Sequence, residues 1–318
     1  MPEPNKYFLG WDKPFLSTAA KWLLEHCLQD ELGTSDRLLI LVSGQAISKR
    51  LQSIFIHEAN KVGRAVELPK ILTPSQLFRN FIEMQGRIAD PTTTLLATVA
   101  ILKSMDPHII APIVGSRRPR EKDFTAWLRI ARHVCDAMST AAGNGYSIDQ
   151  SEWPASAKAI LTESAIKRFD LLKEIQNNLW ESLHKQGLSI FEYEQLALLQ
   201  ESKQLDLGLV ERLVVVGAPD LAGIATQLLG RMLEQDVTID ILIRAPESES
   251  LGFDAYGCID TSCWINREIE INDAAITVSG SPSAQAAAVI RKLEQLGDSV
   301  TTDQITISST DESLIPII

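Results

Sequence analysis

Cysteine is rare in this 318-residue sequence, and the four cysteines form no recognisable metal or disulfide pattern. Cys27, Cys135, Cys258 and Cys263 include no CxxC pair, and no histidine lies at metal-ligand spacing from them. We therefore expect buried free thiols in a protein of a reducing, cytoplasmic compartment. The sequence predicts no metal site.

Basic residues are also scarce, with 30 Lys and Arg against 41 Asp and Glu and a net charge of −11. Such a surface repels polyanions as a whole, so any contact with nucleic acid must come from a local basic patch. No apolar run approaches the roughly 18 residues that a membrane span needs. The first residues lack the basic-then-apolar order of a signal peptide. We expect no membrane association.

Histidine gives no catalytic arrangement either. The five histidines are far apart in the sequence, and none is paired with a serine or cysteine in a nucleophile-elbow context. Internal repeats and low-complexity tracts are absent as well. These absences exclude a repeat protein and give no support to a serine or cysteine hydrolase.

What the sequence does contain is an alternation of apolar strands and amphipathic helices. Helical periodicity from Phe15 to Cys27 precedes an unbroken apolar run from Arg37 to Val42, which is typical of a strand covered on both faces of a parallel sheet. A short loop, SGQAI, leads into a second helix that ends at Gly63. A short strand, Lys70–Thr73, then precedes a helix beginning at Pro74. This order predicts successive βα units.

Helical periodicity dominates from about Asp90 to Gly208, and no strand rich in valine and isoleucine interrupts it. Strand patterns return at Arg212–Pro219 and Thr238–Pro246, separated by a helix. We therefore predict an α/β fold with a parallel sheet and an inserted helical domain.

Near the end of the sequence, extended patterns in AAITVSGSP and in QITISST flank a helix at about 283–296. The last residues are an apolar run, whereas natural termini are more often polar. We expect from this that the chain is cut from a longer sequence.

The first strand, loop and helix are the place to look for chemistry, because a helix N-terminus after a glycine turn directs N–H groups at an anion. A working phosphate loop has the pattern GxxxxGK[ST]. Placed on Gly44, this pattern puts Lys49 at the second glycine, Arg50 at the lysine and Leu51 at the magnesium-binding hydroxyl. Three of the four essential residues differ, so we interpret the segment as a vestigial nucleotide-binding loop. The alternative is that Gly44 is an ordinary turn glycine.

The strand at Arg212–Pro219 lacks the terminal carboxylate with which an ATPase holds magnesium. Gly217 and Ala218 stand at its end, and Asp220 lies in the turn beyond, where we predict that it caps the next helix. ATP and magnesium binding are therefore not expected.

One basic cluster partly offsets the acidic composition, and an aromatic residue follows it in the sequence. Its members are Arg117, Arg118, Arg120, Lys122 and Trp127, with Arg129, Arg132 and His133 beyond. Phosphate binding with a base stacked on Trp127 is one interpretation. The other is a solvated loop before a helix whose Trp127, Ile130, Ala131 and Val134 face the core.

The order LLILVSGQAISKRLQSIF, ILTPSQLF, a helical insertion, RLVVVGAPDLAGIATQLLGRML, ILIRAPESESLGFDAYGCIDTSCW and SGSPSAQAAAVIRKLEQLG resembles the N-terminal part of AddB-type subunits. These are subunits of bacterial helicase–nuclease complexes that act in recombinational repair. The resemblance implies a RecA-like (P-loop NTPase-type) fold in four parts: residues 1–85 and 205–275 form the first RecA-like domain, 86–204 the inserted helical domain, and 276–318 the start of a second RecA-like domain. It also makes Thr73, Ser75 and Gln76 candidates for phosphate contacts with a DNA strand.

The function implied is that of an inactivated helicase-like region that binds or guides DNA in double-strand-break repair while a partner subunit supplies the motor. The nuclease domain that the family carries is not in this sequence. Two alternatives stay open: an active nucleotide-dependent motor with an unorthodox phosphate loop, and a protein–protein adaptor with no role in nucleic-acid binding.

Overall fold

The computed structural model describes residues 3–28, 35–81, 87–115, 118–149, 158–200, 205–268, 271–297, 300 and 305–309. The chain divides into two compact units, Met1–Trp264 and Ile265–Ile318. Among the helices so described, none is both long and apolar enough to cross a lipid bilayer.

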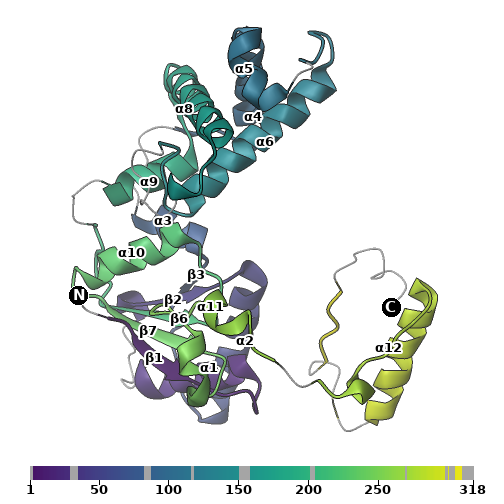
Figure 1. Cartoon of the computed structure of the whole chain (residues 1–318). Helices are drawn as coiled ribbons and strands as arrows, with labels where there is room; N and C mark the ends of the chain where they lie inside the picture. The colour runs from purple at the N-terminus through teal and green to yellow at the C-terminus, as the bar shows by residue number, and fades with distance from the viewer. Residues whose placement is uncertain are drawn as a thin grey trace. The chain divides into compact units, whose positions relative to one another are not determined.

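A five-stranded, all-parallel sheet organises the first unit, which is therefore α/β (Figure 1). Its strand order is β1-β7-β6-β2-β3. The strands are β1 (Asn5–Phe8), β2 (Leu38–Val42), β3 (Lys70–Leu72), β6 (Arg212–Val216) and β7 (Thr238–Ile243). The apolar runs around residues 37–42, 70–73, 212–219 and 238–246 do form strands, as the sequence predicts. Strand β1, at the edge beside β7, was not predicted.

Helices cover both faces of this sheet. On one face, α1 (Phe15–His26) and α2 (Gln45–Lys61) pack against the side chains that β2, β6 and β7 direct to them, including Ile40, Val214 and Leu242. On the other face lie α3 (Pro74–Phe81), α9 (Phe191–Gln200) and α10 (Gly223–Leu233). Burial on both faces explains why β2 reads as an unbroken apolar run in the sequence.

Four further helices pack around a core of their own, and we call them the helical cluster. They are α4 (Pro91–Ser104), α5 (Pro107–Val114), α6 (Phe124–Gly143) and α8 (Glu163–His184). Leu102, Ile110, Trp127 and Ile175 are at most 1% exposed in this core. Short strands β4 (Arg87–Ile88) and β5 (Leu188–Ser189) pair in parallel, so the region in which helical periodicity dominates also contains a small two-stranded sheet.

The helical cluster contacts the α/β part where the end of α6 meets the start of α10. The last residues of α6 lie against the first residue of α10, where a Cβ on Gly223 would come within 2.5 Å of the Asn144 carbonyl oxygen. Glycine at position 223 therefore permits a close approach of the two backbones.

The segment after β7 folds back on the sheet through η3 (Glu247–Gly252) and α11 (Thr261–Trp264). Phe253 forms an isolated antiparallel bridge with Ile259 and packs edge-on against Phe8. The Asp254 carboxylate accepts hydrogen bonds from the backbone N–H groups of Tyr256 and Cys258, which fixes the turn. This carboxylate has a structural role.

The second unit contains η4 (Asp273–Ala275) and α12 (Pro282–Leu296). Of the α12 residues, Ala286 is buried. The extended patterns predicted on either side of this helix form no strand within 271–280 or 305–309. A strand forms where its backbone pairs with a neighbouring strand, and neither described segment is part of such a ladder.

Candidate functional site

An open α/β fold binds ligands at the carboxyl end of its sheet. In this chain the candidate residues after β2, β3 and β6 lie at that end. Register pairs Leu41 with Leu72 and Val42 with Val216, so the connections after β2, β3 and β6 leave the sheet at the same edge. Helix α2 follows β2 on one face, and α10 follows β6 on the other. The boundary between β2 and β6 is thus a topological switch point, the place where ligands bind in such sheets.

The connection at Gly44 is shorter than a phosphate loop. Only Ser43 and Gly44 separate β2 from α2, and Gly44 is the N-cap residue with extended dihedral angles, φ −167° and ψ 163°. The Ser48 N–H already donates to the Gly44 carbonyl oxygen at 3.0 Å, as in an ordinary helix. No heavy atom lies within 4 Å of the position that a Cβ on Gly44 would take. Neither backbone conformation nor close packing therefore requires glycine here.

The other residues aligned with the phosphate loop lie on α2. Lys49 and Arg50 are exposed on the helix surface, whereas Leu51 is fully buried in the core beneath β2 and β6. A buried leucine at this position packs the helix on the sheet and offers no ligand to a metal. A connection of two residues is shorter than the loop with which GxxxxGK[ST] surrounds phosphates.

The connection after β6 has a different construction. Gly217 has φ +56°, a left-handed conformation that favours glycine, and its N–H donates to the Leu242 carbonyl oxygen at 3.0 Å. A Cβ on Gly217 would overlap the ring of Phe15, the first residue of α1. An aromatic ring therefore lies beside β6 at the switch point.

Asp220 is not the cap of the next helix, contrary to the sequence prediction. Helix α10 begins at Gly223, and its N-cap residue is Ala222, whose carbonyl oxygen accepts from the Ala225 N–H at 2.8 Å. Leu221, between Asp220 and this N-cap residue, is buried. The Asp220 side chain is exposed at the carboxyl end of the sheet.

The three residues predicted to contact DNA phosphates at the end of β3 are engaged with one another. The Gln76 side-chain oxygen accepts hydrogen bonds from the Thr73 N–H at 2.9 Å and from the Thr73 hydroxyl at 3.2 Å. Ser75 lies 3.3 Å from that hydroxyl, oxygen to oxygen. A threonine followed three residues later by a glutamine is a helix-capping signature, and it is present in the sequence as TPSQ. Their observed role is to start α3.

The basic cluster separates into structural and exposed members. The Arg118 guanidinium donates to the Lys103 carbonyl oxygen at 2.8 Å, at the end of α4, and lies 5.4 Å from the centroid of the Trp127 ring. Trp127 is 1% exposed and donates its indole N–H to the Arg120 carbonyl oxygen. The indole presents no face to a base, and the core-facing interpretation of Trp127, Ala131 and Val134 is the one the structure has.

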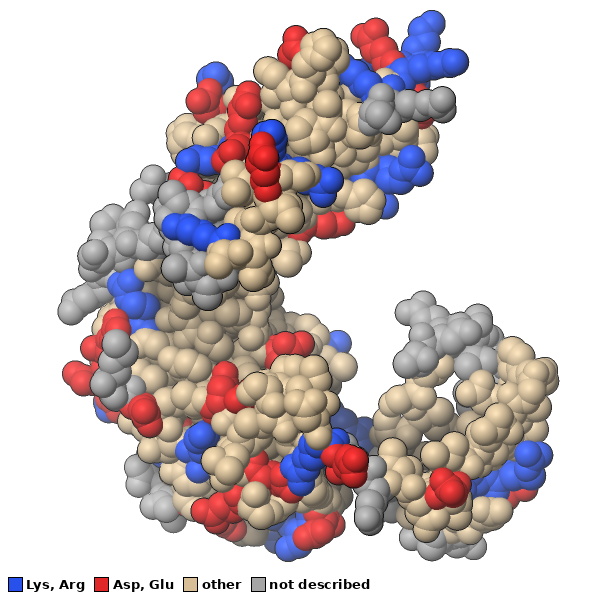
Figure 2. Space-filling view, in the orientation of Figure 1, with Lys and Arg blue, Asp and Glu red and all other residues tan. Residues whose placement is uncertain are grey.

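Arg120 and Lys122 have exposed side chains, as do Arg129 and Arg132 further along α6. Arg117 lies outside the described residues. Figure 2 shows basic and acidic side chains side by side at the end of the helical cluster where α6 begins. The structure does not bring this surface to Thr73: α6 is 20 residues long, about 30 Å, and its other end contacts α10.

A buried polar group that sequence analysis missed lies toward the amino end of the sheet. The Asp240 side chain, on β7, is fully buried and accepts from Arg212 Nε at 2.6 Å and from Asn5 Nδ2 at 2.9 Å. Arg212 also donates to the carbonyl oxygen of His26, the last residue of α1, at 2.9 Å. Arg212 and Asp240 hold three strands and a helix together. Burial raises the pKa of the nearby Cys27 thiol to about 11, so that thiol is not a nucleophile at neutral pH.

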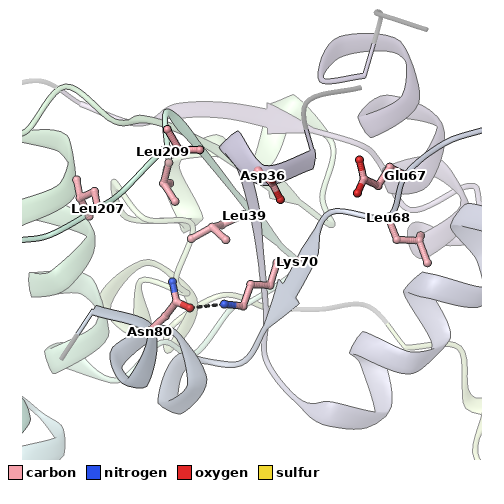
Figure 3. A pocket seen from close by; sticks show the side chains of 9 residues that line it. Asp36, Leu39, Glu67, Leu68, Lys70, Asn80, Leu207 and Leu209 are labelled. Carbon is pink, nitrogen blue, oxygen red and sulfur yellow. Dashed lines mark hydrogen bonds between the residues drawn. The ribbon is translucent and has the colours of Figure 1, made fainter. Parts of the chain in front are cut away.

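A shallow depression opens at the same end of the sheet (Figure 3). Leucine and valine side chains form much of its wall, and Asp36, Glu67, Lys70 and Asn80 stand around it. Lys70 donates a hydrogen bond to Asn80. The lining residues are Asp36, Leu39, Glu67, Leu68, Lys70, Asn80, Leu207, Leu209 and Val210. Two acids against one base make the depression a poor site for phosphate.

Across the part of the chain that the structure describes, no three His, Cys, Asp or Glu side chains gather as a metal site would require. Burial raises the pKa values of the Cys135 and Cys258 thiols. Cys27, Cys135 and Cys258 are half-buried and Cys263 is exposed, so the expectation of buried thiols is wrong for Cys263. No family model matches the chain, and no curated protein matches it.

Proposed function

We propose that this chain is the helicase-like region of an AddB-type subunit, which binds or guides DNA in double-strand-break repair without hydrolysing ATP. In this proposal the five-stranded sheet is a RecA-like domain and the helical cluster is a domain inserted in it, over residues 86–204. Residues 276–318 open a second RecA-like domain. A partner subunit of the helicase–nuclease supplies the motor, and the complex works in the cytoplasm.

The observation that carries the proposal is the entry into α2. The β2–α2 unit stands at the switch point of a parallel sheet, where nucleotides bind in such folds. Yet α2 starts directly after Gly44, and Leu51 on this helix is buried in the core. Gly217, which directly follows the neighbouring strand β6, packs against the Phe15 ring. An ATPase needs a lysine, a hydroxyl and a carboxylate where these residues stand.

The first experiment tests hydrolysis. We expect no ATP turnover with or without single-stranded DNA, and no rise in melting temperature with ATP and magnesium, because a ligand stabilises only a state that it binds. Turnover near ~1 s⁻¹, an ordinary enzyme rate, would establish the motor alternative instead.

The second experiment tests DNA binding. We expect fluorescence anisotropy with a single-stranded oligonucleotide to give an affinity that falls steeply with salt, since each engaged phosphate releases counterions. Replacing Arg120 and Lys122 by glutamate is expected to weaken binding strongly. Two exposed lysines serve as the control, Lys167 on α8 and Lys185 directly after it: the same two charge reversals there leave binding nearly unchanged.

The adaptor alternative has one observation in its favour. Leu209 is 65% exposed and Leu68 is 38% exposed beside Asp36 and Glu67, which gives the depression of Figure 3 an apolar wall and an acidic rim. Exposed apolar surface with a polar rim is typical of protein interfaces. Absent or salt-insensitive binding of single-stranded DNA would favour this adaptor function.

A further inference from the structure

Two aromatic residues near the start of α6 have opposite environments. Trp127 is 1% exposed, whereas Phe124, three residues earlier, is 49% exposed. Trp127 shares its helix face with the buried residues Ala131 and Val134, so the helical period directs the indole into the core. Phe124 is the first residue of the helix, one turn before Trp127 on the same face, and half of its side chain remains exposed at this end of α6. The aromatic ring that the basic cluster offers to solvent is therefore Phe124.

Two exposed cations, Arg120 and Lys122, precede this ring in the turn that leads into α6. The Phe124 N–H donates to the Lys122 carbonyl oxygen at 2.9 Å, so the backbone holds the two residues in one tight turn. The Arg120 carbonyl oxygen accepts from the Asp123 N–H at 2.9 Å within the same turn. Arg132 is exposed about 12 Å further along the helix axis, by the rise of 1.5 Å per residue.

The acids of this segment do not cancel the cations evenly. The Asp123 carboxylate accepts from the Ala126 N–H and caps α6, and Glu121 is exposed. Against these two acids stand Arg120 and Lys122 on the turn, with Arg129 and Arg132 on the helix. The local balance is positive on a chain whose net charge is −11.

The turn is anchored before any ligand arrives. Trp127 fixes it from the core side through the hydrogen bond from its indole N–H to the Arg120 carbonyl oxygen, 3.2 Å. Arg118 lies over the same indole and bonds to the end of α4. Because the backbone carrying Phe124 is held at both ends, a ligand that contacts the ring loses little affinity to ordering the protein.

We propose that Phe124 is a stacking residue for a base of single-stranded nucleic acid, with Arg120 and Lys122 contacting the adjacent phosphates. The inference rests on the proposed DNA-binding function and makes it specific. An exposed aromatic face beside cations is how proteins bind single strands without reading sequence. Duplex DNA would not serve, because its bases are already stacked on one another.

The experiment uses two oligonucleotides of equal length, oligo(dT) and an abasic strand that keeps only sugar and phosphate. Phe124→Ala is expected to weaken oligo(dT) binding about 5- to 100-fold, the effect of losing one stacked base. Binding of the abasic strand is expected to stay the same. Phe124→Trp is expected to retain affinity, and Phe124→Leu to lose it, because leucine supplies apolar area without an aromatic face.

Tyr146 gives a matched control, since it follows the other end of α6 and is also 49% exposed. Tyr146→Ala is expected to bind oligo(dT) as the unsubstituted chain does. If the chain binds oligo(dT) and Phe124→Ala or Phe124→Leu binds equally well, the stacking role is refuted while the proposed function stands. If the unsubstituted chain binds neither strand at low salt, the proposed function fails, and Phe124 with it.

Discussion

The two ends of the five-stranded sheet are held by different chemistry. At the carboxyl end, the switch point carries glycine turns, an aromatic ring and polar side chains that bond to their own helix, as Thr73 and Gln76 do. Toward the amino end, Arg212 and Asp240 form a buried ion pair that joins β6, β7, β1 and α1. The ion pair that joins the strands thus lies toward the amino end of the sheet. The carboxyl end, where an enzyme of this architecture places its charged catalytic groups, has Gly217 packed on Phe15 and the Thr73–Gln76 hydrogen bonds.

The largest effect is expected from Asp240→Asn. Removing this carboxylate leaves the Arg212 guanidinium, 31% exposed, without its charge partner, and breaking a buried pair on one side costs about 3–5 kcal/mol. We expect the free energy of unfolding in urea to fall by about 3 kcal/mol. The double variant Asp240→Leu with Arg212→Met is expected to lose less. A single variant as stable as the parent chain would contradict the role given to the amino end.

At the carboxyl end, Gly217→Ala is expected to cost about 2–3 kcal/mol. The left-handed φ of +56° strains alanine, and the added methyl group overlaps the Phe15 ring. Adding Phe15→Ala should restore part of the loss, with a coupling energy of about 1 kcal/mol in a double-mutant cycle. Strictly additive losses would show that the ring and the glycine do not pack together.

A smaller, pH-dependent effect is expected from Glu58→Gln, at the end of α2 nearest the amino end of the sheet. Glu58 contacts Lys61 at 2.9 Å and Lys21 at 3.6 Å, and the Lys61 hydrogen bond holds its pKa below the usual 4.5. A carboxylate with a lowered pKa stabilises the fold above its unfolded-state pKa and loses that contribution as the pH falls through its folded-state pKa.

Because both lysines are more than half exposed, we expect a difference of only about 0.5–1 kcal/mol at pH 7 between Glu58→Gln and the parent chain. The difference should shrink as the pH falls below 4.5 and through the lowered folded-state pKa of Glu58, as urea titrations at several pH values would show. A difference that persists at low pH would assign the effect to packing.

The smallest effect is expected from Gly44→Ala. The extended φ of −167° suits any residue, and no atom crowds the added methyl group. The change in unfolding free energy should stay within about 0.5 kcal/mol, as for surface substitutions. A loss above 1.5 kcal/mol would mean that Gly44 is constrained as Gly217 is, and the contrast between the two turns would disappear.

Much of the α/β part could be predicted from the sequence. The apolar runs that form β2, β6 and β7 are buried on both faces. A strand buried on both faces has an unbroken run of hydrophobic residues, which can be recognised in the sequence. Strand β1 was missed because it has four residues at a sheet edge, and its pairing with β7 depends on residues more than 230 positions away. The sequence TPSQ is itself a helix-capping signature for Thr73, whereas the resemblance to AddB-type subunits implied that Thr73 contacts DNA.

The candidate site was predicted less well, for a physical reason. Gly44 and Gly217 both follow a buried strand and look alike in sequence, yet only Gly217 has a positive φ and a ring packed on it. Trp127 and Phe124 both neighbour the cations, and α6 buries one and exposes the other.

The amino-acid sequence is enough to locate the central strands β2, β6 and β7 and the helices beside them, because their hydrophobic pattern follows from burial of their own residues. Only the tertiary structure decided which glycine is constrained, which aromatic ring is exposed and which aspartate is paired, since each depends on what distant segments place beside it.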